Sequence, residues 1–178
     1  MGLYGPIEHK YCHPFAERFA DSTEFLNWVL ARIGLPEWVG RSRSLKAEQT
    51  LKRPTAKFWW KNHFCSESRC ECPGLEGREV DILLFCRRDD GATAAIHVEC
   101  KRPGDRFSEG QAKGYPIRAN CWISGSKGPR NLLRHDHFTT LLLCDRAALH
   151  SFEDLSHFKG VIYFDEIAEF ITPYPAIP

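Results

Sequence analysis

The sequence predicts an α/β fold in which a central mixed sheet is flanked by helices. An amphipathic helical pattern occupies residues 21–33, and it is followed by several short apolar runs rich in β-branched and aromatic residues. The clearest of these runs are residues 80–85, 94–100, 139–144 and 160–164. Helical and strand patterns that alternate along a chain are typical of α/β domains. A length of 178 residues suits one domain, so we expect a single domain over residues 1–178.

The first element is a helix that begins at residues 21–24, whose polar side chains are typical of a helix N-terminus. The apolar residues that recur on one face of this helix are Phe25, Trp28, Val29 and Ile33. Gly34 and Pro36 then end it. The polar stretch at residues 42–52 is compatible with a second short helix or with a loop.

Residues 57–64 are aromatic and β-prone, and we expect them to form the first strand of the sheet. Trp59 and Trp60 could stack on unpaired bases. They could equally belong to the core, and adjacent strand residues face opposite sides, so at most one of them would reach a ligand.

A β-hairpin follows. Residues 80–85 form its first strand, and 94–100 form its second. The polar turn between them contains Asp90-Gly91, a dipeptide favoured in tight turns. Further along, residues 139–144 and 160–164 read as buried strands, and a short helix is expected at 165–171.

Three side chains of the hairpin converge as a metal and phosphate site. Glu99 and Lys101 project from one side of the second strand, because side chains alternate along a strand. An antiparallel neighbour can bring Asp81 beside them. Carboxylates are the ligands that Mg²⁺ prefers, while a lysine can orient water or neutralise a phosphate. Asp81, Glu99 and Lys101 therefore indicate a metal-dependent nuclease.

The stretch 78–119 resembles the PD-(D/E)xK, or restriction-endonuclease-like, nuclease superfamily, in which an aspartate on one strand precedes an acid-x-lysine triplet on the next. Val80 stands where the superfamily's name has a proline. The resemblance implies an αβββαβ core and Mg²⁺ or Mn²⁺ bound by Asp81, Glu99 and the backbone carbonyl of Cys100. It also implies that Lys101 positions the attacking water.

Two further parts of the superfamily's site have counterparts here. The superfamily often takes another metal ligand from an early helix, for which the sequence offers Glu17, Glu24 or Glu48, although Glu24 is equally explained as a capping residue.

Gln111 and Tyr115 resemble the helix motif of the lambda-exonuclease-like and RecB-like branches, which lies against the active site. They are four residues apart and so share a helix face. Two alternatives weaken this interpretation. Gln111, three residues after Ser108, could serve only a capping box, and Gly110, Gly114 and Pro116 make this stretch a poor helix.

A loop at residues 63–72 contains His63, Cys65, Cys70 and Cys72, four side chains that could close a tetrahedral Zn²⁺ site. The spacing is not that of a standard zinc knuckle, and the alternative is a loop with free thiols. The other cysteines that stand singly in apolar runs are expected to be core residues: Cys86, Cys100, Cys121 and Cys144.

The net charge is only +1, but basic residues concentrate after the proposed site and could follow a phosphate backbone. They are Lys101, Arg102, Arg106, Lys113, Arg118, Lys127, Arg130 and Arg134. We find no apolar run long enough to cross a membrane and no signal-peptide pattern at the N-terminus, so we expect a cytoplasmic protein without a membrane partner.

The sequence as a whole predicts a Mg²⁺-dependent deoxyribonuclease, an endonuclease, whose partner is DNA. Asp81, Glu99, Lys101, Gln111 and Tyr115 would be its catalytic residues. A homodimer would let two sites cut both strands. The alternatives are a nuclease acting on RNA and a non-catalytic module of the same fold that binds nucleic acid or protein.

Overall fold

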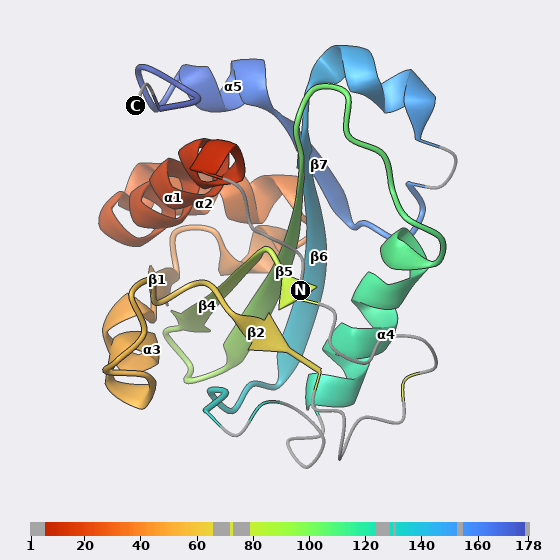
Figure 1. Cartoon of the computed structure of the whole chain (residues 1–178). Coiled ribbons are helices and arrows are strands. Elements are labelled where there is room, and N and C mark those ends of the chain that lie inside the picture. The colour runs from red at the N-terminus through yellow and green to blue at the C-terminus, as the bar shows by residue number, and fades with distance from the viewer. Residues whose placement is uncertain are drawn as a thin grey trace.

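The chain folds around a curled five-stranded mixed sheet with helices on both faces (Figure 1). The computed structural model describes residues 6–65, 72, 79–123, 129, 131–152 and 155–176. Its helices are α1 (Pro6–Asp21), α2 (Thr23–Arg32), α3 (Lys46–Lys52), α4 (Gln111–Ile123) and α5 (Phe164–Ala168), with 3₁₀ turns at Pro36–Trp38 and Arg146–Ser151. Its strands are β1 (Ser42–Ser44), β2 (His63–Phe64), β3 (Glu79–Val80), β4 (Ile82–Arg88), β5 (Thr93–Lys101), β6 (His137–Cys144) and β7 (Gly160–Tyr163).

The main sheet has the strand order β1-β4-β5-β6-β7. β4 pairs antiparallel with both β1 and β5, whereas β5, β6 and β7 are parallel. β2 and β3 form a separate two-stranded sheet. Because α4 connects the parallel strands β5 and β6, it covers one face of the sheet, as a crossover helix does.

The predicted hairpin is confirmed as β4 and β5. At its turn, the Ala92 N–H donates to the Asp90 carboxylate at 3.1 Å, and Gly91 adopts a φ of 94°. That φ lies in the left-handed region that glycine enters without steric cost. All nine residues of β5 are buried, so this strand is the centre of the fold.

The two faces of the sheet carry separate apolar clusters. Ile96, Val98 and Cys100 of β5 contribute to the larger cluster, which includes α1 and α2. Ala95 contributes to the second cluster, which includes Tyr115 and other residues of α4. Cys100 therefore points away from the face of Glu99 and Lys101, as strand alternation requires.

Most of the expected elements are present. Helix α2 begins after Ser22, whose hydroxyl accepts from the Phe25 N–H at 3.2 Å. The two C-terminal strands and the short helix after them are present as β6, β7 and α5. The polar stretch at 42–52, for which the sequence allowed a helix or a loop, contains strand β1 and helix α3.

The prediction of a strand at residues 57–64 is wrong. Only His63 and Phe64 are in a strand, and the preceding residues form turns. Trp59 and Trp60 are 7% and 0% exposed and belong to the larger core cluster, so neither is available to stack on a base. The Trp59 indole N–H donates to Glu17 at 2.8 Å, which fixes this side chain against α1.

Helix α1 was not expected from the sequence. Its buried residues Cys12, Phe15, Ala16 and Phe19 have the three- and four-residue spacing of an amphipathic helix. Within the described ranges, no helix is both long and apolar enough to traverse a bilayer.

Candidate active site

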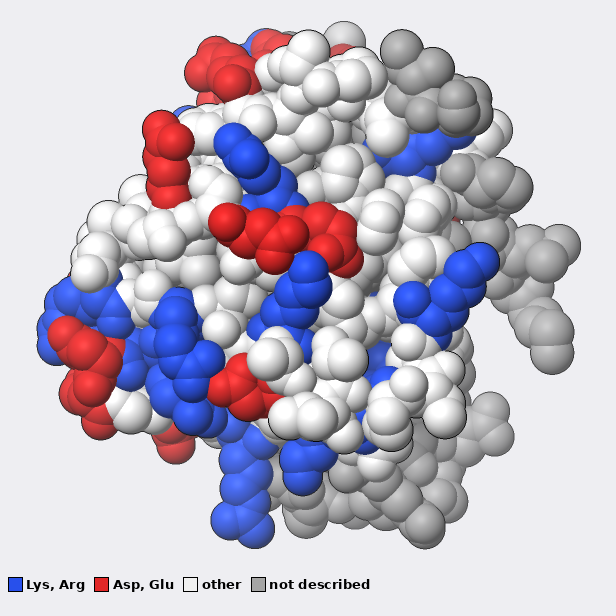
Figure 2. Space-filling view, turned by 90° about the vertical axis from the view of Figure 1, so that its left-hand side faces the viewer, with Lys and Arg blue, Asp and Glu red and all other residues white. Residues whose placement is uncertain are grey.

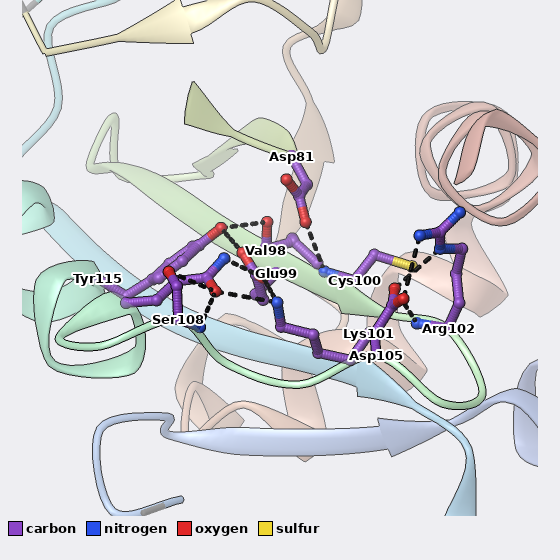
Figure 3. Close-up of polar contacts among 10 residues, drawn as sticks. Asp81, Val98, Glu99, Cys100, Lys101, Arg102, Asp105, Ser108 and Tyr115 are labelled. Atoms are coloured by element: carbon purple, nitrogen blue, oxygen red, sulfur yellow. Dashed lines mark hydrogen bonds and ion pairs between the residues drawn. The ribbon is translucent and has the colours of Figure 1, made fainter. Parts of the chain in front are cut away.

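Asp81, Glu99 and Lys101 converge where β3 gives way to β4 and where β5 ends (Figure 3). The register that pairs Ile82 with Val98 places Asp81 opposite Glu99. The Asp81 carboxylate accepts a hydrogen bond from the Cys100 N–H at 2.8 Å. The peptide between Glu99 and Lys101 is thus fixed against Asp81, and the hairpin brings the three predicted side chains to one place.

Glu99 is the most constrained of the three, with 1% of its surface exposed. One carboxylate oxygen, Oε1, lies 2.8 Å from Lys101 Nζ and accepts from Gln111 Nε2 at 2.6 Å. The other oxygen accepts from the Tyr115 hydroxyl. A buried carboxylate needs such partners, because an unpaired charge in the interior is costly.

Lys101 is also buried, at 7% exposure. Its Nζ donates to Gln111 Oε1 at 3.0 Å in addition to its ion pair with Glu99. The ring of Phe107 lies beneath it, with Nζ 4.9 Å from the ring centroid. The ammonium is therefore held at a fixed place beside the carboxylates.

Gln111 and Tyr115 lie four residues apart on α4, and both contact Glu99. Gln111 also caps the N-terminus of its own helix, as the capping-box alternative predicted, since its Oε1 accepts from the Ser108 N–H at 3.0 Å. Its Nε2 remains available for Glu99, so one side chain serves both roles. The glycine and proline residues do not prevent α4 from running 13 residues.

The carboxylates of this site repel one another in the absence of a cation. Burial, followed by the charge of Glu99, raises the pKa of Asp81 well above its usual value. Glu8, on α1, shows the same effect: burial and the charge of Glu99 raise its pKa from 4.5 to about 7. Hard oxygen ligands with unfavourable mutual charge suit a divalent cation, which would remove the repulsion.

Glu8 is a further candidate that the sequence patterns did not indicate. The three early glutamates that they did indicate are engaged elsewhere or exposed: Glu17 binds Lys46 at 2.6 Å, Glu48 binds Arg43 at 2.7 Å, and Glu24 is exposed on α2. Glu8 stands four residues before Cys12, on the buried face of α1. An acid in line with an apolar helix face was the available signal.

The zinc site expected at residues 63–72 remains a prediction. Cys70 lies outside the described residues, and within the described residues no three His, Cys, Asp or Glu side chains are grouped as metal ligands. His63 is buried with Arg53 Nη1 3.1 Å from its Nε2. Burial and this guanidinium lower the pKa of His63 from 6.5 to about 3. A positive charge next to the ring is unfavourable for a cation bound there.

The basic residues near the site have different surroundings. Arg118 is 2% exposed, and its guanidinium lies over the Tyr115 ring at 4.5 Å, so its predicted contact with phosphate is wrong. Arg102 pairs with Asp105 at 2.8 Å. Arg106 and Lys113 are exposed, whereas Lys127 and Arg130 lie outside the described residues.

The face formed by α1 and α3 does not provide a basic surface. Figure 2 shows acidic and basic side chains interspersed on this side of the molecule. The ion pairs around β1 and the β4–β5 turn include Arg41–Asp89 at 2.7 Å and Arg43–Glu48 at 2.7 Å.

Comparisons of the chain with protein-family models, curated proteins and solved structures returned no match.

Proposed function

We propose that the protein is a Mg²⁺- or Mn²⁺-dependent nuclease that hydrolyses DNA phosphodiester bonds. The observation that supports this proposal most directly is the convergence of Asp81, Glu99 and Lys101 around the Cys100 peptide. Two carboxylates and an ammonium group in this arrangement match the chemistry of metal-assisted phosphodiester hydrolysis.

The fold is compatible with the same proposal. A hairpin, a crossover helix and a parallel strand follow one another as β4, β5, α4 and β6. These four elements would form the ββαβ part of the αβββαβ core of the PD-(D/E)xK superfamily, which the chain resembles in its Asp81, Glu99 and Lys101 motif. Gln111 and Tyr115 both contact Glu99 and would correspond to the helix motif of the RecB-like branch.

The residues of the site would have distinct roles in binding the metal, positioning the water and orienting the ligands. Asp81, Glu99 and the Cys100 carbonyl would hold the metal, and the nearby charge of Glu8 would add to the attraction for it. The bound metal would polarise the phosphate and lower the pKa of a coordinated water. Lys101 would orient the attacking water and offset the charge that develops on the phosphate. Gln111 and Tyr115 would hold Glu99 in position, because both donate to its carboxylate.

Cleavage assays on purified protein test this proposal. Circular and linear DNA and single-stranded RNA are incubated with Mg²⁺, with Mn²⁺ or with EDTA, beside the Asp81→Asn protein. We expect DNA cleavage that needs the metal and is absent in the variant, and cutting of circular DNA would establish endonuclease action. Cleavage of RNA but not of DNA would show that the protein is a ribonuclease. Oligonucleotide binding without any cleavage would contradict it and favour a non-catalytic binding module.

Glu8→Gln is expected to lower cleavage by about 10–100-fold, as losses around metal ligands commonly do, and to stabilise the metal-free protein near neutral pH. The pKa of Glu8 is about 7 in the folded state against 4.5 for a free side chain. Its contribution to stability is therefore fully present below pH 4.5 and is lost as the pH rises through about 7. Glutamine is neutral and does not undergo this loss.

Melting temperatures measured in EDTA at several pH values check the expectation for Glu8. The variant should melt above the wild type at pH 8, with the difference disappearing near pH 4. Glu24→Gln, an exposed substitution on α2, is the matched control and should change neither quantity. A Glu8→Gln protein that cleaves as the wild type does would show that Glu8 is not part of the site.

A further inference from the structure

A hollow of about 430 Å³ lies at the N-terminus of α4, where it is lined by residues 106–113 and by Phe152 and His157. Its walls include two basic side chains, Arg106 and Lys113, and two aromatic rings, Phe107 and Phe152. Glu109 is the one acidic residue among the described residues that line it. The lining therefore combines positive charge with apolar surface.

The two basic residues differ from most others near the site. Arg106 and Lys113 are both exposed, and within the described part of the chain neither forms an ion pair. By contrast, Arg102 is paired with Asp105. An exposed cation without a carboxylate partner can meet a phosphate without first giving up an existing pair.

The hollow shares two of its walls with the candidate active site. Gln111 lines it and also contacts both Lys101 and Glu99. Phe107 lines it and also lies beneath Lys101 Nζ. A nucleic-acid strand with its scissile phosphate at Lys101 would therefore bring an adjoining nucleotide to this opening.

The size and chemistry of the hollow fit one nucleotide. Pockets for small ligands are commonly about 300–1,000 Å³ and combine apolar walls with a few polar groups. Bases of single strands stack or pack on aromatic side chains while cations follow the phosphates. A base that remains paired within a duplex cannot enter such a pocket unless it leaves the helix.

We propose that this hollow binds an unpaired nucleotide next to the scissile phosphate, so that the substrate is single-stranded nucleic acid or the single-stranded end of a duplex. This inference rests on the proposed nuclease function, because it places the nucleotide relative to Lys101. Arg106 and Lys113 contact the phosphates on either side of the bound nucleotide, and the half-buried Phe107 ring packs against its base.

Binding without cleavage tests the hollow by itself. Fluorescence anisotropy of a short labelled oligothymidylate is measured in EDTA with the wild type, Arg106→Glu and Lys113→Glu. Each variant is expected to bind about tenfold more weakly, since a phosphate contact is replaced by repulsion. Lys52→Glu, an equal charge change on the exposed surface of α3, is the matched control and should stay within about twofold of the wild type. Equal losses in all three variants would overturn the inference.

Cleavage then separates this inference from the proposed function. With Mn²⁺, the wild type should cut an oligothymidylate and a duplex with a single-stranded overhang, and it should spare the same duplex with blunt ends. Cutting of blunt duplex at the same rate would refute the unpaired-nucleotide inference while leaving the nuclease intact. Absence of cleavage on every substrate would instead refute the nuclease proposal, whatever the anisotropy shows.

Discussion

Replacing Asp81 with asparagine is expected to abolish metal-dependent cleavage and, at the same time, to stabilise the metal-free protein. The activity loss should be about 10³-fold or more, because a metal contributes several kcal/mol to the transition state and each 1.36 kcal/mol is about tenfold in rate. The gain in stability follows from the site's electrostatics. Burial and Glu99 raise the pKa of Asp81, so its charged form destabilises the fold at neutral pH.

The substitution is structurally mild. Asparagine keeps an oxygen that can accept from the Cys100 N–H, so the contact that positions this peptide is retained. Only the charge is removed. Thermal melts in EDTA and in Mn²⁺ give both readouts. Without metal the variant should melt above the wild type, and each 1 kcal/mol of stabilisation corresponds to about 2–4 °C in a chain of this size. With metal, only the wild type should gain further stability.

Asp105→Asn is the matched control for Asp81→Asn. Burial tends to raise the pKa of Asp105, but its hydrogen bonds with Arg102 outweigh this and lower it. Its charge therefore stabilises the fold above its usual titration range, and asparagine should lower the melting temperature. If Asp81→Asn lowers the melting temperature as Asp105→Asn does, the proposed repulsion at Asp81 is incorrect.

The sequence predicts those parts of the fold that depend on residues close together in the chain. The turn at Asp90-Gly91 and the alternation of β4 and β5 are short-range features, and together they determine that Asp81 and Glu99 face each other. Helix α2 was predictable for the same reason, because Ser22 and the apolar face after it lie within a few turns.

The parts that were not predictable depend on contacts between distant segments. Residues 57–64 have strand propensity, but Trp59 and Trp60 are instead drawn into the core beside α1, and burial outweighs local preference. Arg118 was predicted to contact phosphate because it lies in a basic stretch of the sequence, but the packing of α4 places its guanidinium over the Tyr115 ring. The role of Glu8 depends on how α1 packs near β5, which no local pattern specifies.

Lys101→Met is expected to lower cleavage by about 10²–10⁴-fold, the range associated with a positioned proton-transfer group, while leaving metal binding intact. Methionine keeps most of the length of the side chain and removes the ammonium group. Glu99 then loses its ion pair and keeps only its neutral donors, Gln111 and Tyr115. Breaking a buried pair in this way commonly costs about 3–5 kcal/mol, so the metal-free variant should melt well below the wild type.

Metal should reverse this loss, and that reversal distinguishes Lys101 from Asp81. A divalent cation beside Glu99 would replace the missing positive charge, so Mn²⁺ should raise the melting temperature of Lys101→Met by more than it raises that of the wild type. Lys159→Met, at an exposed position just before β7, controls for the loss of a lysine. The two active-site variants should thus be alike in lacking activity and opposite in their response to metal. Failure of Mn²⁺ to stabilise Lys101→Met would show that Glu99 does not bind the metal, because neutralising this carboxylate is the source of the expected gain.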